Sequence, residues 1–141
     1  MSILVEPLDV IVVAYDGSTQ AKKALQIAKE FRSKFGSKIY VIHVIDVATL
    51  ITDPSACAQV EAELEKRAQK LAEEAKAFLK DAEVRIVRGD PAHEIVEFAK
   101  QVNASLIIVG SRGLSTLKRV LLGSVSSRVV HESPISVLVV K

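Results

Sequence analysis

The chain has 141 residues, of which 49% are hydrophobic and 26% charged, which is the composition of one folded domain and not of a disordered segment. Its formal net charge of +2 is too small, and its 4% of aromatic residues too few, to favour a nucleic-acid-binding protein. One cysteine, Cys57, excludes an internal disulfide, and no apolar run has the length of a membrane-spanning helix. Because no secretory signal precedes the first apolar run, we expect a cytoplasmic protein.

Short apolar runs alternate with longer amphipathic segments along the chain. The apolar, β-branched runs predict strands at residues 10–14, 38–46, 83–87, 105–109 and 135–140. Helical spacing of apolar residues predicts helices between residues 18 and 36, at 56–80, from 90 to 102 and from 123 to about 131. Strands that alternate with helices indicate a single α/β domain, with an open parallel sheet covered by helices on both faces.

Residue types at the helix ends support these boundaries. Ser18 and Asp90 are predicted N-caps, Pro91 is suited to a first helical position, and Gly36 to a position just after a helix. Residues 47–55 contain an Asp-Pro pair and predict a loop before the long helix.

The long helix has an apolar stripe and a charged face. The stripe contains Val60, Leu64, Ala68, Leu71, Ala75 and either Phe78 or Leu79. On the opposite face, Glu63 with Arg67 and Lys70 with Glu74 have the spacing of helical ion pairs. Such charges usually form a solvated face, and we assign no function to them.

The stretch after the fourth predicted strand carries the strongest functional signal. It contains Gly110, Gly113 and Gly123 at a spacing of Gly-x2-Gly-x9-Gly, followed by Ser124. Glycines allow a ligand to approach the main chain, and the N-terminus of the next helix attracts phosphate, so the stretch predicts a phosphate cradle. Ser124 is expected to be both N-cap and phosphate ligand. The alternative is that these glycines only mark a turn.

Several motifs together resemble the universal stress protein family. The glycine spacing is similar to the Gly-x2-Gly-x9-Gly-[Ser/Thr] signature of its ATP-binding members, and similar stretches occur at residues 12–18, 43–46, 89–92 and 134–140. The resemblance covers the whole chain and implies one Rossmann-like nucleotide-binding domain, residues 1–141, with a five-stranded parallel sheet of order 3-2-1-4-5. It further implies bound ATP, with Mg or Mn held mainly through the phosphates.

The same resemblance implies a set of site residues in a crevice at the first and fourth strands. Ala14 and Asp16 would lie beside the base and ribose, and the main chain of Val44 would bind the adenine. Asp16 also suits a simple turn or cap position. The residues implied around the ribose and phosphates are Gly110, Ser111, Arg112, Gly113, Gly123, Ser124, Val125 and Ser126.

Other polar residues give weaker signals. His43 lies in an apolar strand and is expected to be a hydrogen-bonded residue of the core or its rim. No cluster of histidine, cysteine and aspartate has the spacing of a protein-bound metal, so we predict none.

The resemblance implies a stress-response module that binds ATP, or AMP or another adenine nucleotide, and signals to a regulatory protein partner. It also implies a homodimer formed through the last strand, residues 135–140, whose apolar edge would otherwise be unpaired. The alternatives are a slow ATPase or nucleotide phosphotransferase, and a dimeric interaction module that binds no nucleotide. The pattern Gly-x4-Gly-Lys-[Ser/Thr] is absent from the sequence, so efficient hydrolysis is not expected. No catalytic residue, nucleic acid or membrane contact is predicted.

Overall fold

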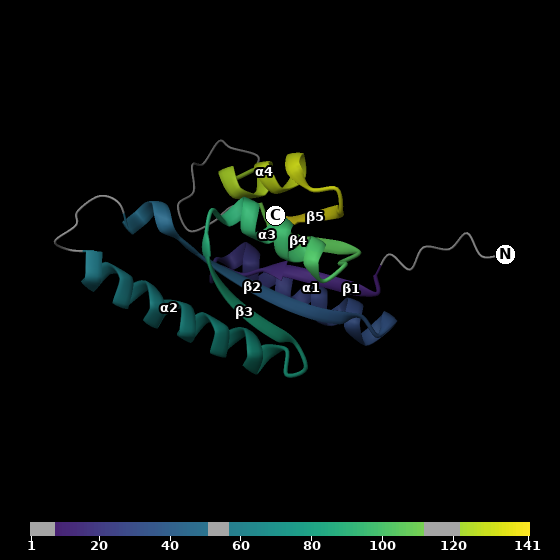
Figure 1. Cartoon of the computed structure of the whole chain (residues 1–141). Coiled ribbons are helices and arrows are strands. Elements are labelled where there is room, and N and C mark those ends of the chain that lie inside the picture. The colour runs from purple at the N-terminus through teal and green to yellow at the C-terminus, as the bar shows by residue number, and fades with distance from the viewer. Residues whose placement is uncertain (1–7, 51–56, 112–121) are drawn as a thin grey trace.

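The computed structural model describes residues 8–50, 57–111 and 122–141. In chain order the elements are β1 (Val10–Ala14), α1 (Thr19–Phe35), β2 (Lys38–Asp46), the short 3-10 helix η1 (Val47–Leu50), α2 (Cys57–Phe78), β3 (Glu83–Gly89), α3 (Pro91–Gln101), β4 (Leu106–Gly110), α4 (Ser124–Glu132) and β5 (Ser136–Val140). Figure 1 shows these elements as one sheet between two layers of helices.

The five strands form a parallel sheet of order β3-β2-β1-β4-β5. This confirms both the α/β fold and the expected strand order. The chain moves outward from β1 in one direction and then returns to β4 on its other side, so the order reverses between β1 and β4. In open sheets of this kind, ligands bind beyond the carboxyl ends of the strands at that reversal.

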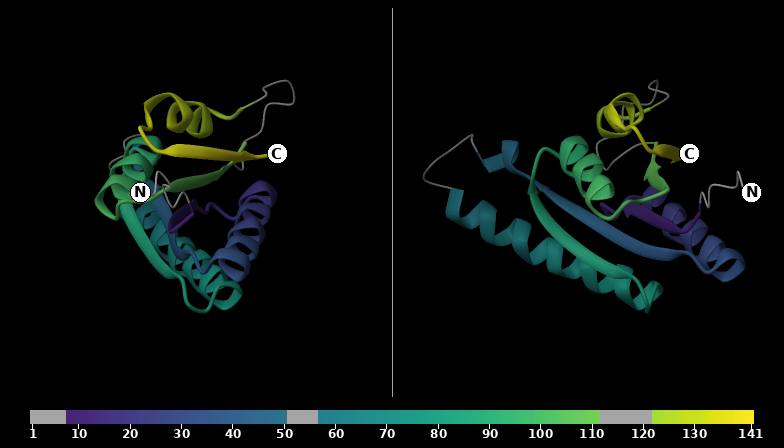
Figure 2. Two further views of the ribbon diagram at one scale, coloured as in Figure 1. Left: turned by 90° about the vertical axis from the view of Figure 1, so that its right-hand side faces the viewer. Right: turned by 45° about the vertical axis from the view of Figure 1, so that its right-hand side comes forward.

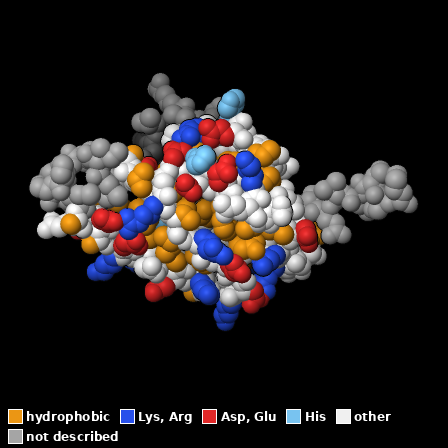
Figure 3. All heavy atoms as spheres, viewed as in Figure 1, with side chains coloured by type: hydrophobic (Ala, Val, Ile, Leu, Met, Phe, Trp, Pro, Cys, Tyr) orange, Lys and Arg blue, Asp and Glu red, His pale blue; other side chains and the backbone are white. Residues whose placement is uncertain are grey.

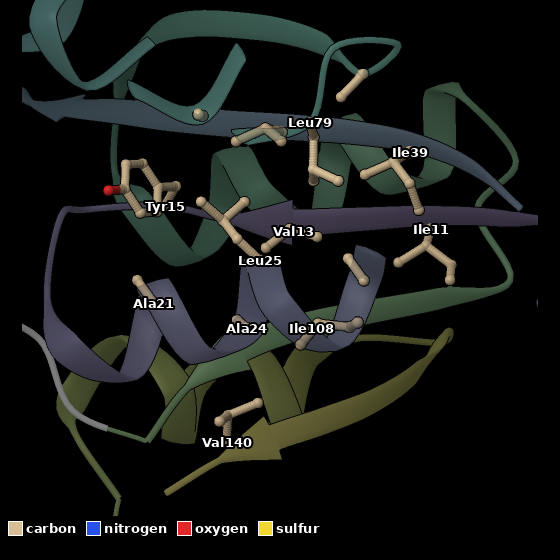
Figure 4. Packing of buried hydrophobic residues seen from close by; sticks show 14 of the residues in the cluster. Ile11, Val13, Tyr15, Ala21, Ala24, Leu25, Ile39, Leu79, Ile108 and Val140 are labelled. Carbon is tan, nitrogen blue, oxygen red and sulfur yellow. The ribbon is translucent and has the colours of Figure 1, made fainter. Parts of the chain in front are cut away.

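Two apolar clusters pack on opposite faces of the sheet. Helices α1 and α2 cover one face and α3 and α4 the other, as Figures 1 and 2 show. Side chains of β1 alternate between the two clusters: Val13 packs toward α1 (Figure 4) and Val12 toward α3. Both are completely buried, which explains why this strand is a continuous apolar run without polar alternation.

Most predicted boundaries agree with the structure to within one or two residues. The Ser18 hydroxyl caps α1 by accepting from the Ala21 amide, Gly36 ends α1 at φ 69°, and Asp90 caps α3 with Pro91 in its first turn. Strand β3 extends through Gly89, beyond the predicted end at residue 87. The apolar stripe of α2 is completed by buried Leu79, directly after the helix, and not by the more exposed Phe78.

The visible surface is polar and mixed in charge. Figure 3 shows basic and acidic side chains interspersed on the face formed by α2, β3 and α3. Within the described ranges, no helix combines the length and apolar character needed to cross a membrane.

Candidate functional site

A cavity of about 320 Å³ opens at the carboxyl ends of β1, β2 and β4, beside the first turn of α4. This is the edge of the sheet at which the strand order reverses, and its volume lies at the lower end of the range of small-molecule sites, roughly 300–1,000 Å³. Its walls come from the β1–α1 loop, the end of β2, the start of α3 and the start of α4. The fold therefore creates the crevice that the sequence predicts.

The β1–α1 loop forms one wall of the cavity. The Asp16 carboxylate accepts a hydrogen bond of 2.9 Å from the Ser18 amide, and both residues line the cavity. Gly17 between them has φ 84°, which favours glycine. Asp16 is thus a turn residue and a cavity residue at once, and the two interpretations of this residue do not conflict.

Helix α2 holds this loop from outside the cavity. The Arg67 guanidinium donates a 3.1 Å hydrogen bond to the Asp16 carbonyl, and the Tyr15 hydroxyl donates one of 3.2 Å to the Glu74 carboxylate. A Cβ at Gly17 would lie only 2.8 Å from Leu71 Cδ2, so α2 packs directly against the glycine.

These roles of Arg67 and Glu74 were not predicted from the sequence. Their spacing to Glu63 and Lys70 suggested ion pairs along a solvated face. Both side chains instead contact a loop more than fifty residues away in sequence, and no local pattern distinguishes such a contact from an ordinary charged helix surface.

Tyr15 is buried between the sheet and α2, with only 4% of its surface exposed. Figure 4 shows its ring at one end of the apolar cluster, with the phenol oxygen directed away from the cluster. Burial raises the pKa of Tyr15 to about 12, and the neighbouring Glu74 carboxylate adds to the increase. The phenol therefore stays neutral at physiological pH and acts as a hydrogen-bond donor.

His43 connects β2 to the same loop. Its Nδ1 lies 2.8 Å from the Tyr15 carbonyl, and since a carbonyl only accepts, Nδ1 must carry a proton. The ring is half-buried and lines the cavity. The expectation of a hydrogen-bonded histidine at the rim of the core is correct, and its place in the cavity wall was not predicted.

The main chain of Val44 lies where β2 extends past β1. The Ile42 carbonyl accepts a hydrogen bond from the Tyr15 amide, so Ile42 directs its main chain toward β1. Val44, two residues later, has the same orientation, but the β1 pairing ends at Ala14 opposite Ile42. The Val44 main-chain groups consequently face the cavity side of β2, next to the lining residues.

The first turn of α4 forms the opposite end of the cavity. Gly123 is its N-cap, with φ −73° and ψ 168°, and no side chain of the described residues caps the helix. By contrast, Ser18 and Asp90 satisfy first-turn amides of α1 and α3. An uncapped helix N-terminus has amide groups available for an anion.

The prediction that Ser124 is the N-cap is wrong. Gly123 takes the extended conformation required of the cap, and Ser124 is the first residue of the helix. A side chain at that position points out of the helix start, and Ser124 is indeed exposed and lines the cavity. Its role as a phosphate ligand stays a prediction.

A set of internal hydrogen bonds joins α4 to the end of β4. The buried Ser126 hydroxyl donates to the Ser111 carbonyl at 3.0 Å and lies 3.1 Å from the Gly123 carbonyl. The Gly123 amide also donates to the Ser111 carbonyl. The Ser126 hydroxyl therefore uses its proton within the protein and fixes this wall of the cavity.

Gly110 lies against the first turn of α1. A Cβ there would lie 2.8 Å from Gln20 Cβ and 3.2 Å from the Ala21 amide nitrogen. The glycine therefore allows α1 to approach the end of β4, in addition to lining the cavity.

The structure brings most of the predicted site residues together. Those that line the cavity are Ala14, Asp16, Val44, Gly110, Gly123, Ser124, Val125 and Ser126. Ser111 lies behind this lining, and Arg112 and Gly113 fall outside the described residues. Lining residues that the sequence analysis did not select are Tyr15, Ser18, Ala21, Ile42, His43, Asp46, Pro91, Ile95 and Val109.

The described lining contains two carboxylates, of Asp16 and Asp46, and neither lysine nor arginine. Carboxylates accept hydrogen bonds from hydroxyl groups, as a sugar would offer, whereas α4 offers amides to an anion. Asp46 already accepts from the Ala48 amide at 3.0 Å. Among the described residues, no group of three histidine, cysteine or acidic side chains is placed to hold a metal ion.

The parallel sheet, with a cavity at the point where its strand order reverses, defines the chain as an open-sheet α/β protein. Comparison with known proteins gives its family. Residues 7–141 match the Universal stress protein family. The chain is also 37% identical to Universal stress protein MJ0531 of Methanocaldococcus jannaschii, over 93% of this chain and 81% of that protein. The chain belongs to the universal stress protein family.

Solved structures agree with this assignment. The structure of hypothetical protein MJ0577 is similar with a TM-score of 0.88 and 33% identity, over 95% of this chain and 96% of that one. A universal stress protein crystallised in complex with cAMP is similar with a TM-score of 0.73 and 29% identity, over 94% and 97% of the two chains. The ligand of that relative, cAMP, is an adenine nucleotide.

Proposed function

We propose that this protein is a cytoplasmic, homodimeric stress-response module that binds ATP in the cavity at the reversal of the sheet. AMP or another adenine nucleotide is the alternative ligand of the same site. The base lies against Ala14 and the main chain of Val44, the ribose beside Asp16, and the phosphates at the start of α4. A regulatory protein partner then responds to whether the site is occupied.

One observation carries this proposal: among the described residues no side chain caps the first turn of α4, and Ser124, Val125 and Ser126 of that turn line a cavity. The amides of a first helical turn have no acceptor within the helix. Phosphate oxygens supply such acceptors, and the helix dipole favours their charge. The cAMP complex of a structural relative supports an adenine nucleotide as the class of ligand.

The donor set also fits a divalent metal that arrives with the nucleotide. Among the described lining residues only Asp16 and Asp46 offer carboxylate oxygens, which Mg and Mn favour as ligands. Two carboxylates do not make a complete protein site, so the phosphates would provide the other oxygens. The metal would neutralise the charge of the phosphates, because the described residues that line the cavity include neither lysine nor arginine.

The dimer is proposed to form through the free edge of β5. The Val140 carbonyl accepts from the Ser111 amide at 2.7 Å, so Val140 directs its main chain toward β4. Main-chain groups of successive residues point to opposite sides of a strand. Val139 therefore presents its amide and carbonyl to the free edge of the sheet, where a second copy of β5 could pair.

Val139→Pro tests this interface because it removes an outward amide without removing a β4 hydrogen bond. We expect the proline variant to be monomeric by light scattering and Val139→Thr to remain dimeric. A proline variant that is folded and still dimeric would place the interface elsewhere.

Nucleotide binding is tested by identifying any nucleotide released when the purified protein is denatured, followed by calorimetric titration of ATP with Mg²⁺. Retained adenine nucleotide or saturable binding, without rapid hydrolysis, supports the proposal. Absence of binding by ATP, AMP and cAMP would contradict it.

A further inference from the structure

The loop that forms the ribose side of the cavity is held not only from β2 but also from a helix, α2, that does not line the cavity. Arg67, Leu71 and Glu74 lie one turn apart on α2, and each contacts the segment from Tyr15 to Gly17. In the described part of the chain, no residue of α2 is among the cavity lining. These contacts therefore act on the site through the loop.

We propose that Arg67 is a positioning residue of the ligand site, which couples α2 to the orientation of Asp16. This inference rests on the proposed function, because Asp16 is there the ribose-side residue. Arg67 supplies the one polar contact in this group that reaches the main chain of a lining residue.

The geometry at Asp16 explains how the coupling works. Its carbonyl accepts from Arg67 on the outer side, while its carboxylate accepts from the Ser18 amide at 2.9 Å. Restraining the carbonyl fixes the peptide plane between Asp16 and Gly17. Since Gly17 at φ 84° allows more backbone conformations than other residues, this peptide would rotate more freely without the arginine, and the carboxylate would move with it.

Coupling of this kind is reciprocal. If the contact of Arg67 with Asp16 strengthens ligand binding by some factor, ligand binding strengthens the contact by the same factor. Occupancy of the cavity would thus tighten the attachment of α2 to the loop. The outer face of α2 is exposed at Arg67 and Lys70, so a change in α2 is accessible to a partner.

A purely structural role makes a different prediction. Arg67 is exposed, and an exposed hydrogen bond contributes little to global stability. We therefore expect Arg67→Ala to leave the thermal midpoint nearly unchanged while weakening AMP binding by about three- to tenfold, the range of one modest hydrogen bond. The affinity of Arg67→Ala for adenine, which has no ribose, should fall much less than its affinity for AMP. Arg67→Lys should recover part of the lost AMP affinity. Lys70→Ala, on the same exposed face, is the matched control.

A second readout needs no ligand. Hydrogen exchange of the Ser18 amide, followed by NMR in the unliganded protein, reports how often its bond to the Asp16 carboxylate opens. We expect faster exchange in Arg67→Ala than in wild type or Lys70→Ala.

The outcomes separate this inference from the proposed function. If wild type binds AMP and Arg67→Ala binds it with the same affinity, the inference about Arg67 is overturned while the proposed function stands. Unchanged hydrogen exchange of the Ser18 amide in Arg67→Ala would have the same consequence. An equal loss for AMP and adenine would reduce Arg67 to a structural residue and also overturn it. If wild type binds no adenine nucleotide, the proposed function fails, and Arg67 has no positioning role toward such a ligand.

Discussion

The Ser126 hydroxyl donates a 3.0 Å hydrogen bond to the carbonyl of Ser111. One residue follows β4 and the other lies in the first turn of α4, so this buried contact joins the two ends of the glycine-containing segment. The same carbonyl accepts from the Gly123 amide. The start of α4 is thereby fixed to the sheet at the position proposed for the phosphates.

Replacing Ser126 with alanine should destabilise the protein by about 1 kcal/mol, because a buried hydrogen bond is lost while Ser111 keeps its second donor. For a domain of this size the thermal midpoint should fall by about 3 °C. Phosphate-bearing ligands should also bind more weakly, since the first turn of α4 is less restrained. Thermal unfolding and calorimetric titration measure the two effects.

The control for this variant is Ser127→Ala, which changes the next, exposed serine. It should match wild type in both measurements. Equal effects at the two positions would show that helix propensity, not the contact with Ser111, determines the result.

The fold was predictable because its signals are local. The buried strand from Val10 to Ala14, the cap at Ser18 and the Asp90-Pro91 pair each reflect conditions that neighbouring residues impose. The strand order came from the family resemblance, since periodicity does not determine which strands are neighbours. Most of the cavity followed from these two sources together.

The missed contacts are long-range. Periodicity shows which face of α2 is polar, but not that Arg67 and Glu74 would reach the loop after β1. The hydrogen bond of His43 to the Tyr15 carbonyl is also long-range, because it depends on where β2 lies relative to the end of β1. The error at Ser124 has another cause: glycine and serine both suit an N-cap, and the two adjacent residues could not be distinguished.

The ionisation of Tyr15 should be measurable in a Tyr40→Phe background, which leaves one tyrosine of the two in the chain. With its pKa raised to about 12, Tyr15 should form tyrosinate near that pH, well above the ordinary value of about 10. Near-ultraviolet absorbance across an alkaline titration, with circular dichroism to monitor folding, gives the midpoint. A folded protein that titrates near pH 10 would contradict the burial of this phenol.

The sign of the linked stability change follows from the direction of the shift. Because the folded-state pKa lies above the unfolded one, the contribution of Tyr15 is complete below about pH 10 and is lost as the pH rises toward 12. Glu74→Gln should lower the midpoint while leaving it above 10, since burial is the largest cause of the shift.

Asp90 should govern part of the stability in acid. The Arg128 guanidinium, at 2.8 Å, and then the His93 amide hold the pKa of the Asp90 carboxyl below its ordinary value. Its contribution is therefore complete above the unfolded pKa of about 4 and is lost as the pH falls through the lower folded value. Urea unfolding of wild type and Asp90→Asn should show wild type more stable at neutral pH, with the difference decreasing below about pH 4. A difference that does not depend on pH would assign the effect to capping geometry alone.

Ser124→Glu is the sharpest test of whether the N-terminus of α4 holds the phosphates. Glutamate suits a first helical turn, so folding should be preserved, but its charge would lie in the cavity beside the phosphate. We predict that calorimetric titration will show AMP and ATP affinity reduced by at least about tenfold, or roughly 1.4 kcal/mol, while adenosine binding is nearly unchanged. Ser127→Glu, exposed and outside the cavity lining, should bind all three ligands like wild type. Undiminished AMP and ATP binding by Ser124→Glu would show that the phosphates do not bind at the N-terminus of α4.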